Sequence, residues 1–292
     1  MAGRDVIRFE RGDLRLSVLD GGSLWLDGGA MFGVVPRALW QRLRQPDDRN
    51  RIRLAMNLLL IEDGSRRILV DTGSGTDWDE KSRKIYNMDA RDAGRILEPA
   101  GLDPADIDVV VNTHLHFDHA SGNVRMEGGM AVPTFPNAEY LVQRAEVETA
   151  KLDFDRVRAA YPRINHEPLL DAGRMKLLDG DTRLFGYLDL EVARGHTPGM
   201  QIVRVTTGKE CVAFMADLFP TASHLPNAYV MGFDLEPMET MASKAAVLPR
   251  AMDEGWTVVF EHDAELPVAR LDMHDGRPRA TAVQADAIEE TR

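Results

Sequence analysis

The stretch His114-Leu115-His116-Phe117-Asp118-His119 decides how this sequence is interpreted. It comes two residues after a mainly apolar segment, residues 107–111, that predicts a buried strand. Side chains alternate in direction along an extended chain, so the first, third and fifth residues of the stretch point to one side. The last histidine joins them if the chain turns there, and the small residues that follow permit a tight turn into a helix. Ligands on one face of a helix recur four residues apart, so this spacing places the cluster on a loop.

Four side chains of the kinds that bind metals therefore lie close together. Imidazole and carboxylate groups suit Zn²⁺ and similar divalent ions, and without a cation they would repel or desolvate one another. His196, Asp217 and His262 each stand just past the carboxyl end of another predicted strand. Strand ends of an α/β sheet converge on one edge, where such folds place their sites. The sequence therefore predicts one metal site assembled from distant segments.

Apolar runs and helical spacing predict an α/β fold. Strands occur toward both ends of the chain with helices between them, which favours two sheets packed together and covered by helices. We expect one domain over residues 1–292, with a polar, poorly ordered tail over 275–292. The predicted strands are 13–19, 54–62, 67–70, 107–111, 175–178, 188–193, 202–205, 211–215 and 257–260, and the predicted helices are 89–98 and 237–254.

Composition and net charge limit the classes of binding partner that this protein is expected to have. The formal net charge is −12, so the basic footprint of a nucleic-acid-binding protein is missing. A single cysteine, Cys211, rules out an intrachain disulfide and fits a reducing compartment. Neither a signal peptide nor a run of ~18 apolar residues is present, so we expect a cytoplasmic protein without a membrane partner. The expected partner is a small molecule, and a homodimer is left open.

The pattern His-x-His-x-Asp-His, with a distant His, Asp and His, resembles the metallo-β-lactamase superfamily over roughly residues 54–262. The resemblance implies an αββα sandwich, two mixed sheets flanked by helices, with two metal ions at one edge. It also implies that Asp71, in Val70-Asp71-Thr72-Gly73, orients a ligand from behind the site. The implied ligands are His114, His116 and His196 for the first ion, Asp118, His119 and His262 for the second, and Asp217 as the bridge.

Individual positions indicate which branches of the superfamily the sequence resembles. A glutamate at His116 would indicate the oxygen-reducing di-iron branch, and β-lactamases usually carry cysteine or serine at Asp217. The nucleic-acid-processing branches usually carry additional domains or motifs, which are not seen. Asp217 fits lactonases, glyoxalase II-like thioesterases and methyl parathion hydrolase-like enzymes. Residues 31–36, 49–52 and Asn57 are similar to the quorum-quenching lactonase-like branch.

One position departs from that branch. The best-known acyl-homoserine lactonases carry a tyrosine three residues after the bridging aspartate, and here the residue is Pro220. The phenol that donates to the substrate is therefore missing from its place. His224 or Tyr229, in the same loop, are the alternatives that the sequence offers.

We expect a hydrolase of lactones or other carboxylic esters. Two divalent ions ~3.5–4 Å apart would share a hydroxide nucleophile. They are expected to be Zn²⁺, with Mn²⁺, Fe²⁺ and Co²⁺ as alternatives. Asp118 would pass a proton to the leaving alkoxide, and Asp217 would hold both ions. The other functions left open are a phosphotriesterase or arylesterase, a thioesterase, and a non-catalytic metal-binding sensor. The expected substrate contacts are Met31, Phe32, Phe117, Phe219 and His224.

Overall fold

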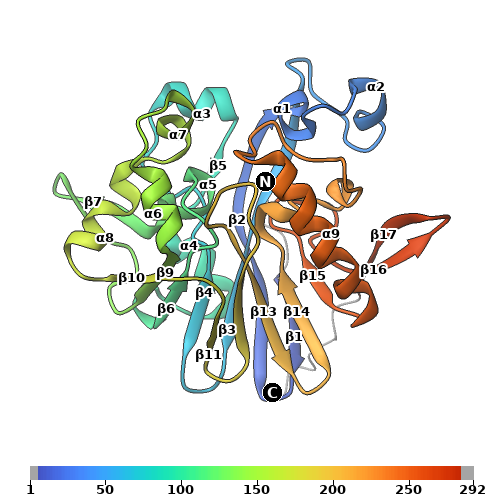
Figure 1. Ribbon diagram of the computed structural model, residues 1–292. Coiled ribbons are helices and arrows are strands. Elements are labelled where there is room, and N and C mark those ends of the chain that lie inside the picture. The colour runs from blue at the N-terminus through green and yellow to red at the C-terminus, as the bar shows by residue number, and fades with distance from the viewer. Residues whose placement is uncertain (1–5, 284–292) are drawn as a thin grey trace.

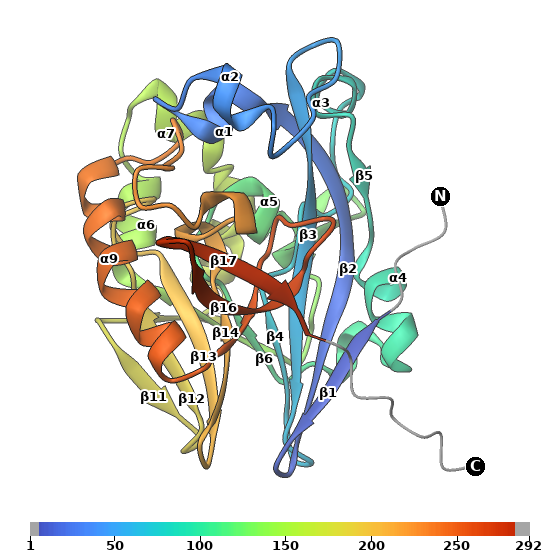
Figure 2. The same ribbon diagram turned by 90° about the vertical axis from the view of Figure 1, so that its right-hand side faces the viewer.

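Two β-sheets lie face to face, with helices on their outer sides (Figures 1 and 2). The computed structural model describes residues 6–283. The first sheet has the strand order β1-β2-β3-β4-β6-β9-β10, with β5 beside β2, and the second runs from β11 to β17 in chain order. Both sheets are mixed, because β4, β6, β9 and β10 are parallel in the first and β14 and β15 are parallel in the second. The αββα sandwich is therefore confirmed.

The strands of the first sheet are β1 (Ile7–Arg11), β2 (Leu14–Asp27), β3 (Arg51–Glu62), β4 (Arg67–Val70), β5 (Asp89–Ala90), β6 (Val109–Val111), β9 (Glu139–Gln143) and β10 (Met175–Leu178). Those of the second sheet are β11 (Thr182–Leu184), β12 (Leu188–Val192), β13 (Gln201–Thr207), β14 (Glu210–Phe214), β15 (Thr257–Val259), β16 (Val268–His274) and β17 (Arg277–Ala282). A separate hairpin consists of β7 (Val124–Glu127) and β8 (Met130–Pro133).

The continuous apolar run in β3 is explained by two cores. Leu59 and Ile61 belong to the core between the sheets, together with residues such as Phe214 of β14. Leu58 and Leu60 alternate with them and belong to a second core on the outer face of the first sheet. A strand buried on both faces needs apolar side chains at every position, so it shows no polar alternation.

Helices cover both outer faces. They are α1 (Gly28–Phe32), α2 (Arg37–Trp40), α3 (Glu80–Tyr86), α4 (Ala93–Leu97), α5 (Phe117–Ala120), α6 (Arg144–Ala150), α7 (Asp155–Ala160), α8 (Glu167–Asp171) and α9 (Pro237–Asp253). α4 and α6 contribute to the core on the first sheet. α9 packs Val247 and Ala251 onto the second sheet, in a hydrophobic cluster that is continuous with the core between the sheets. Among the helices of residues 6–283, none is both long and apolar enough to cross a membrane.

Two predictions of local structure are wrong. The predicted helix 89–98 begins as strand β5, and α4 starts only at Ala93, where the side chain of Asp92 caps the helix by accepting from Arg95 N. The predicted tail is structured as far as residue 283. Asp275 and Gly276 both have positive φ and form the turn of the β16–β17 hairpin, as two-residue hairpin turns require. Residues 284–292 of that tail lie outside the described residues.

Gly195 lies where the turn after β12 meets the first turn of α9. Its φ is +133°, and a Cβ there would lie 2.1 Å from Thr240 N. Gly208, in the β13–β14 turn, also has a positive φ, of +58°, but a Cβ there would meet nothing within 4 Å. Gly208 therefore shows left-handed backbone strain without overlap, whereas Gly195 combines overlap with a φ that L residues adopt still less readily.

We expect Gly208→Ala to lower the free energy of unfolding by about 1–2 kcal/mol, because it adds backbone strain alone. Gly195→Ala adds the overlap with α9, worth about 1–3 kcal/mol more. Urea unfolding of the two variants beside the wild type measures both losses. Equal losses would show that α9 moves away without cost.

Candidate metal centre

The predicted ligand residues meet at one edge of the sandwich. β6 ends just before His114 and His116, and the short helix α5 then carries Asp118 and His119. The other three follow strands of the second sheet: His196 after β12, Asp217 in a 3-10 turn after β14, and His262 after β15. All seven side chains are buried. The strand ends therefore converge as the sequence predicts.

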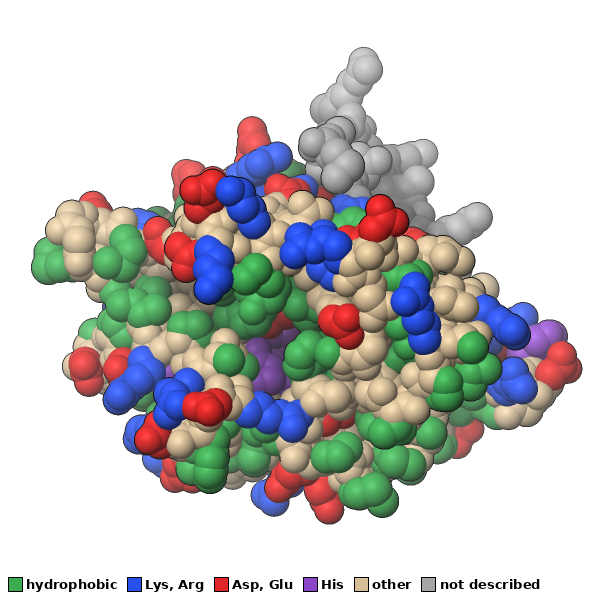
Figure 3. Space-filling model, turned by 90° about the horizontal axis from the view of Figure 1, so that it is seen from above, with side chains coloured by type: hydrophobic (Ala, Val, Ile, Leu, Met, Phe, Trp, Pro, Cys, Tyr) green, Lys and Arg blue, Asp and Glu red, His purple; other side chains and the backbone are tan. Residues whose placement is uncertain are grey.

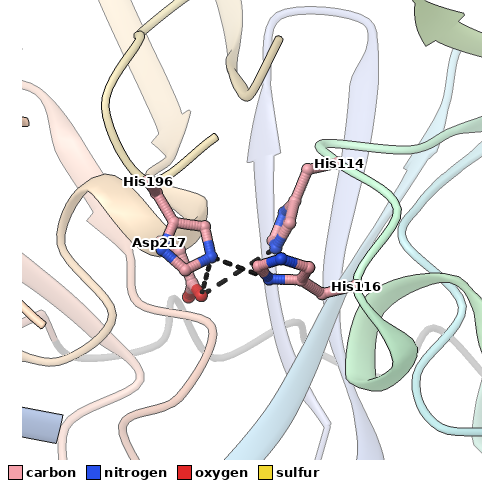
Figure 4. A group of neighbouring side chains, drawn as sticks. All are labelled: His114, His116, His196 and Asp217. Atoms are coloured by element: carbon pink, nitrogen blue, oxygen red, sulfur yellow. Dashed lines mark hydrogen bonds and ion pairs between the residues drawn. The ribbon is translucent and has the colours of Figure 1, made fainter. Parts of the chain in front are cut away.

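The first group of side chains consists of His114, His116, His196 and Asp217, shown in Figure 4. One ligand-type atom from each lies within 4.8 Å of all the others. His196 Nε2 lies 2.9 Å from His116 Nδ1 and 3.0 Å from Asp217 Oδ2. Three rings and one carboxylate thus point to a common centre.

The second group consists of Asp118, His119 and His262, whose ligand-type atoms also lie within 4.8 Å of one another. His262 Nε2 is 3.2 Å from His119 Nε2 and 3.1 Å from Asp217 Oδ1. Asp217 therefore turns Oδ1 toward the second group and Oδ2 toward His196 of the first group. Its carboxylate stands between the two groups.

The charges and lone pairs of this cluster fit a bound cation. Burial alone would raise the pKa of Asp217, but His196, His262 and His119 hold that pKa well below its usual range. His114 Nε2 is buried and has no hydrogen-bond partner among residues 6–283. Imidazole nitrogens that face each other at 2.9 and 3.2 Å need a proton or a cation between them. Divalent metal ions satisfy all these atoms at once, so the residues fit a metal.

The rings of three histidines are oriented by polar partners of the nitrogen that faces away from the cluster centre. His196 Nδ1 lies 2.9 Å from Asp234 Oδ1, and His262 Nδ1 lies 2.7 Å from a backbone carbonyl oxygen, that of Ala55. His119 Nδ1 is 3.1 Å from Asp71 Oδ2. Each contact leaves Nε2 facing the centre of the cluster, as partners behind a metal ligand do.

Asp71 lies behind the site, where the sequence analysis places it. Its Oδ1 accepts from Thr113 N at 2.7 Å and its Oδ2 accepts from Thr113 Oγ1 at 2.6 Å. The same carboxylate therefore holds the loop that leads into His114 and the ring of His119. Its backbone has a positive φ, 58°, which aspartate tolerates better than most residues.

Comparison with known proteins agrees with this geometry. The family model described as the metallo-beta-lactamase superfamily matches residues 53–262. The chain belongs to this superfamily. An N-acyl homoserine lactonase of Bacillus sp is 31% identical over 173 residues, which cover 58% of this chain and 61% of that protein. The chain is thus matched to less than two thirds of that relative's length.

Solved structures superimpose on most of the chain. One is a probable metal-dependent hydrolase from Staphylococcus aureus, with a TM-score of 0.86 and 28% identity over 94% of this chain and 97% of that one. Another is AidC, a dizinc quorum-quenching lactonase, with a TM-score of 0.79 and 20% identity over 96% and 98%. The second likeness shows the fold alone.

A cavity of about 550 Å³ opens onto the cluster of metal-ligand side chains. Seen from above, histidine lies at the bottom of a hollow surrounded by hydrophobic side chains (Figure 3). His116, Asp118, His196, Asp217 and His262 line its floor. Most of the remaining lining is apolar and includes Trp25, Leu54, Val157, Met231 and Leu235. The cavity suits an apolar group attached to a polar reacting centre.

The predicted substrate contacts divide into two sets. Met31 and Phe117 line the cavity. Phe32 and Phe219 do not, so their predicted contact with substrate is wrong in this structure. Phe32 is fully buried in a stack with Trp40, and Phe219 is fully buried. Both aromatic rings belong to hydrophobic cores and not to the cavity wall.

His224 does not line the cavity either. Its Nδ1 lies 2.8 Å from Thr221 Oγ1 and its Nε2 lies 2.9 Å from Met31 O, so neither ring nitrogen is free. Burial lowers the pKa of His224 to about 3. Tyr229 also lies outside the cavity lining, and the Pro220 carbonyl accepts from His262 N at 2.9 Å. The prediction of a substrate contact at His224 is therefore wrong.

Three buried carboxylates were not predicted. Asp234 contacts His196, as described above, and Glu261 Oε2 lies 2.9 Å from His119 Nδ1. Burial raises the pKa of Glu261 to about 8, against the opposing effect of His119. The position of Glu261, directly before His262, was the available signal. Glu146 lies on α6, and nothing in its local sequence marks it.

Glu146 joins the two loops that carry the first group. Its Oε2 accepts from Leu115 N and from the Tyr161 hydroxyl, each at 3.1 Å. Its Oε1 accepts from Thr197 Oγ1 and, at 3.0 Å, from Gly199 N. Leu115 separates His114 from His116, and Thr197 follows His196. One carboxylate thus fixes the spacing between segments that lie far apart in the sequence.

We expect Glu146→Gln to lower the free energy of unfolding by about 2–3 kcal/mol, because the amide nitrogen cannot accept and leaves buried donors unpaired. Glu148→Gln, at an exposed position on the same helix, should change it by less than about 0.5 kcal/mol. Denaturant unfolding compares the two variants. Similar values for both would contradict the role given to Glu146.

Proposed function

We propose that this chain is a hydrolase of lactones or other carboxylic esters that works with two divalent metal ions. The observation that carries the proposal is the Asp217 carboxylate, with one oxygen toward each group of ligand-type side chains. The cavity above it is mostly apolar, and a relative is named N-acyl homoserine lactonase. A small neutral ester with an apolar group fits both observations.

In this proposal the two groups hold one ion each and share Asp217. Zn²⁺ is the ion that we propose, because imidazole nitrogen and carboxylate oxygen are its usual ligands besides thiolate. The structurally similar AidC is described as a dizinc enzyme. The ligands would be His114, His116 and His196 for one ion, Asp118, His119 and His262 for the other, and Asp217 for both.

When bound, such ions lower the pKa of a coordinated water toward neutrality and polarise the scissile carbonyl. The protein's own residues then position the substrate and move protons. Asp118 lines the cavity, and its carboxylate lies 3.8 Å from both His119 and His262. It can take the proton of the attacking water and deliver it to the leaving oxygen as the acyl C–O bond breaks. The apolar walls bind the acyl group and exclude bulk water.

We expect protein purified without chelator to contain two equivalents of transition metal by elemental analysis. Asp217→Asn should lower this content to one equivalent or less, because the shared ligand loses its charge, and should reduce kcat at least about 100-fold. Asp253→Asn, at an exposed position at the end of α9, is the matched control and should keep both equivalents. A reproducible single equivalent in the fully loaded wild type would overturn the dinuclear proposal.

The substrate class is tested by a kinetic panel of an acyl lactone, an aryl ester, a thioester, a phosphotriester and a β-lactam. We expect kcat/KM for the lactone or the carboxylic ester to exceed that for the β-lactam at least about 100-fold, a difference of about 2.8 kcal/mol in the activation barrier. Chelator should abolish the activity, and added Zn²⁺ should restore it. A highest kcat/KM for the phosphotriester would favour a methyl parathion hydrolase-like function, and a highest value for the thioester would favour a glyoxalase II-like one.

A further inference from the structure

Tyr86 and Phe117 line the cavity, and Trp78 packs against both of their rings without lining the cavity itself. The rings of Tyr86 and Phe117 have centroids 5.3 Å apart, and Trp78 meets Phe117 edge to face at 5.2 Å. Trp78 is itself held in place, since its indole nitrogen donates to Ser74 O at 2.7 Å. Tyr86 is the last residue of α3, which ends at Asn87 in the left-handed conformation. The Tyr86 ring is therefore positioned by a helix end and by two neighbouring aromatic rings.

The Tyr86 hydroxyl is available to a ligand. Tyr86 is half-buried and lines the cavity, yet its hydroxyl makes no hydrogen bond within residues 6–283. The other tyrosine of the cavity lining, Tyr161, differs, because its hydroxyl donates to Glu146. The Tyr86 oxygen is not one of the fully buried polar atoms that lack a partner, so water reaches it and a bound molecule can take the place of that water.

The position of Tyr86 points to the leaving-group side of the site. Phe117, which its ring contacts, directly precedes Asp118 in α5, and Asp118 lines the same cavity. A tyrosine hydroxyl is a neutral hydrogen-bond donor at neutral pH. We propose that the Tyr86 hydroxyl donates a hydrogen bond to the leaving oxygen of the ester while Asp118 supplies the proton. This inference rests on the proposed function.

The stabilisation that such a hydrogen bond provides increases with the negative charge on the oxygen that accepts it. An alkoxide leaving from a lactone or an alkyl ester develops concentrated negative charge on one oxygen, and a fixed donor stabilises that charge as it forms. A nitrophenolate spreads its charge over the ring and leaves readily without help. The contribution of Tyr86 should therefore increase as the leaving alcohol becomes less acidic, which a packing role for the ring would not produce.

The test is a set of esters with one acyl chain and leaving groups from 4-nitrophenol to a simple alkanol, plus the matching γ-lactone. For Tyr86→Phe we expect kcat on the 4-nitrophenyl ester within about 2-fold of wild type and a loss of about 10- to 30-fold on the alkyl ester and the lactone, the range of one good hydrogen bond. Tyr229→Phe is the matched control, because this tyrosine lies outside the cavity lining and should follow the wild type throughout. Metal content and the urea midpoint are measured for each variant.

The outcomes separate the two proposals. An equal loss on every substrate, or no loss on any, would overturn the role of Tyr86 while leaving the hydrolase proposal intact. A wild-type protein with full metal content that hydrolyses none of the esters would overturn the proposed function, and the role of Tyr86 with it. A loss that increases steadily with the pKa of the leaving alcohol supports both.

Discussion

The architecture of the site depends on one buried carboxylate among five imidazoles. The histidines around Asp217 hold its carboxylate in the ionised form, and its two oxygens approach His196 of the first group and His262 of the second. Rings brought this close in a dry environment are stable only when charge and lone pairs are neutralised together. The surrounding carboxylates, Asp71, Asp234 and Glu261, continue this neutralisation outward from the rings. Asp217 therefore lies at the centre of the histidines, and the other three carboxylates contact the ring nitrogens that face away from it.

The sandwich supplies that arrangement by bringing two sheets to a common edge. Strands β6, β12, β14 and β15 contribute their carboxyl ends, and each of the two groups combines residues that follow strands of both sheets. Glu146 and Gly195 then set the remaining distances, one through hydrogen bonds between loops and the other through the absence of a side chain against α9. Contacts made by residues that neighbour the ligands in the sequence therefore help to set the separation of the ligand atoms.

Sequence reasoning located what is local or periodic. The histidine-rich stretch, the strands that precede His196, Asp217 and His262, and helix α9 are marked by spacing, apolar runs and end signals, and the structure contains each of them. It failed where a role depends on contacts between distant segments. The sequence shows His224 as a histidine in the loop near Asp217, but the fold turns both of its ring nitrogens toward protein atoms. Glu146 lies in a short helix, and its role depends on the hydrogen bonds that two distant loops donate to it in the folded chain.

The β16–β17 hairpin has a consequence for solubility. β17 ends its sheet, so one side of its backbone faces no neighbouring strand within the described residues, and such edges invite pairing with other molecules. Its sequence is Arg277-Pro278-Arg279-Ala280-Thr281-Ala282. A proline cannot donate a ladder hydrogen bond, and two arginines would place like charges side by side if two such edges met. The edge of this sheet is therefore protected by its own side chains against indefinite strand addition.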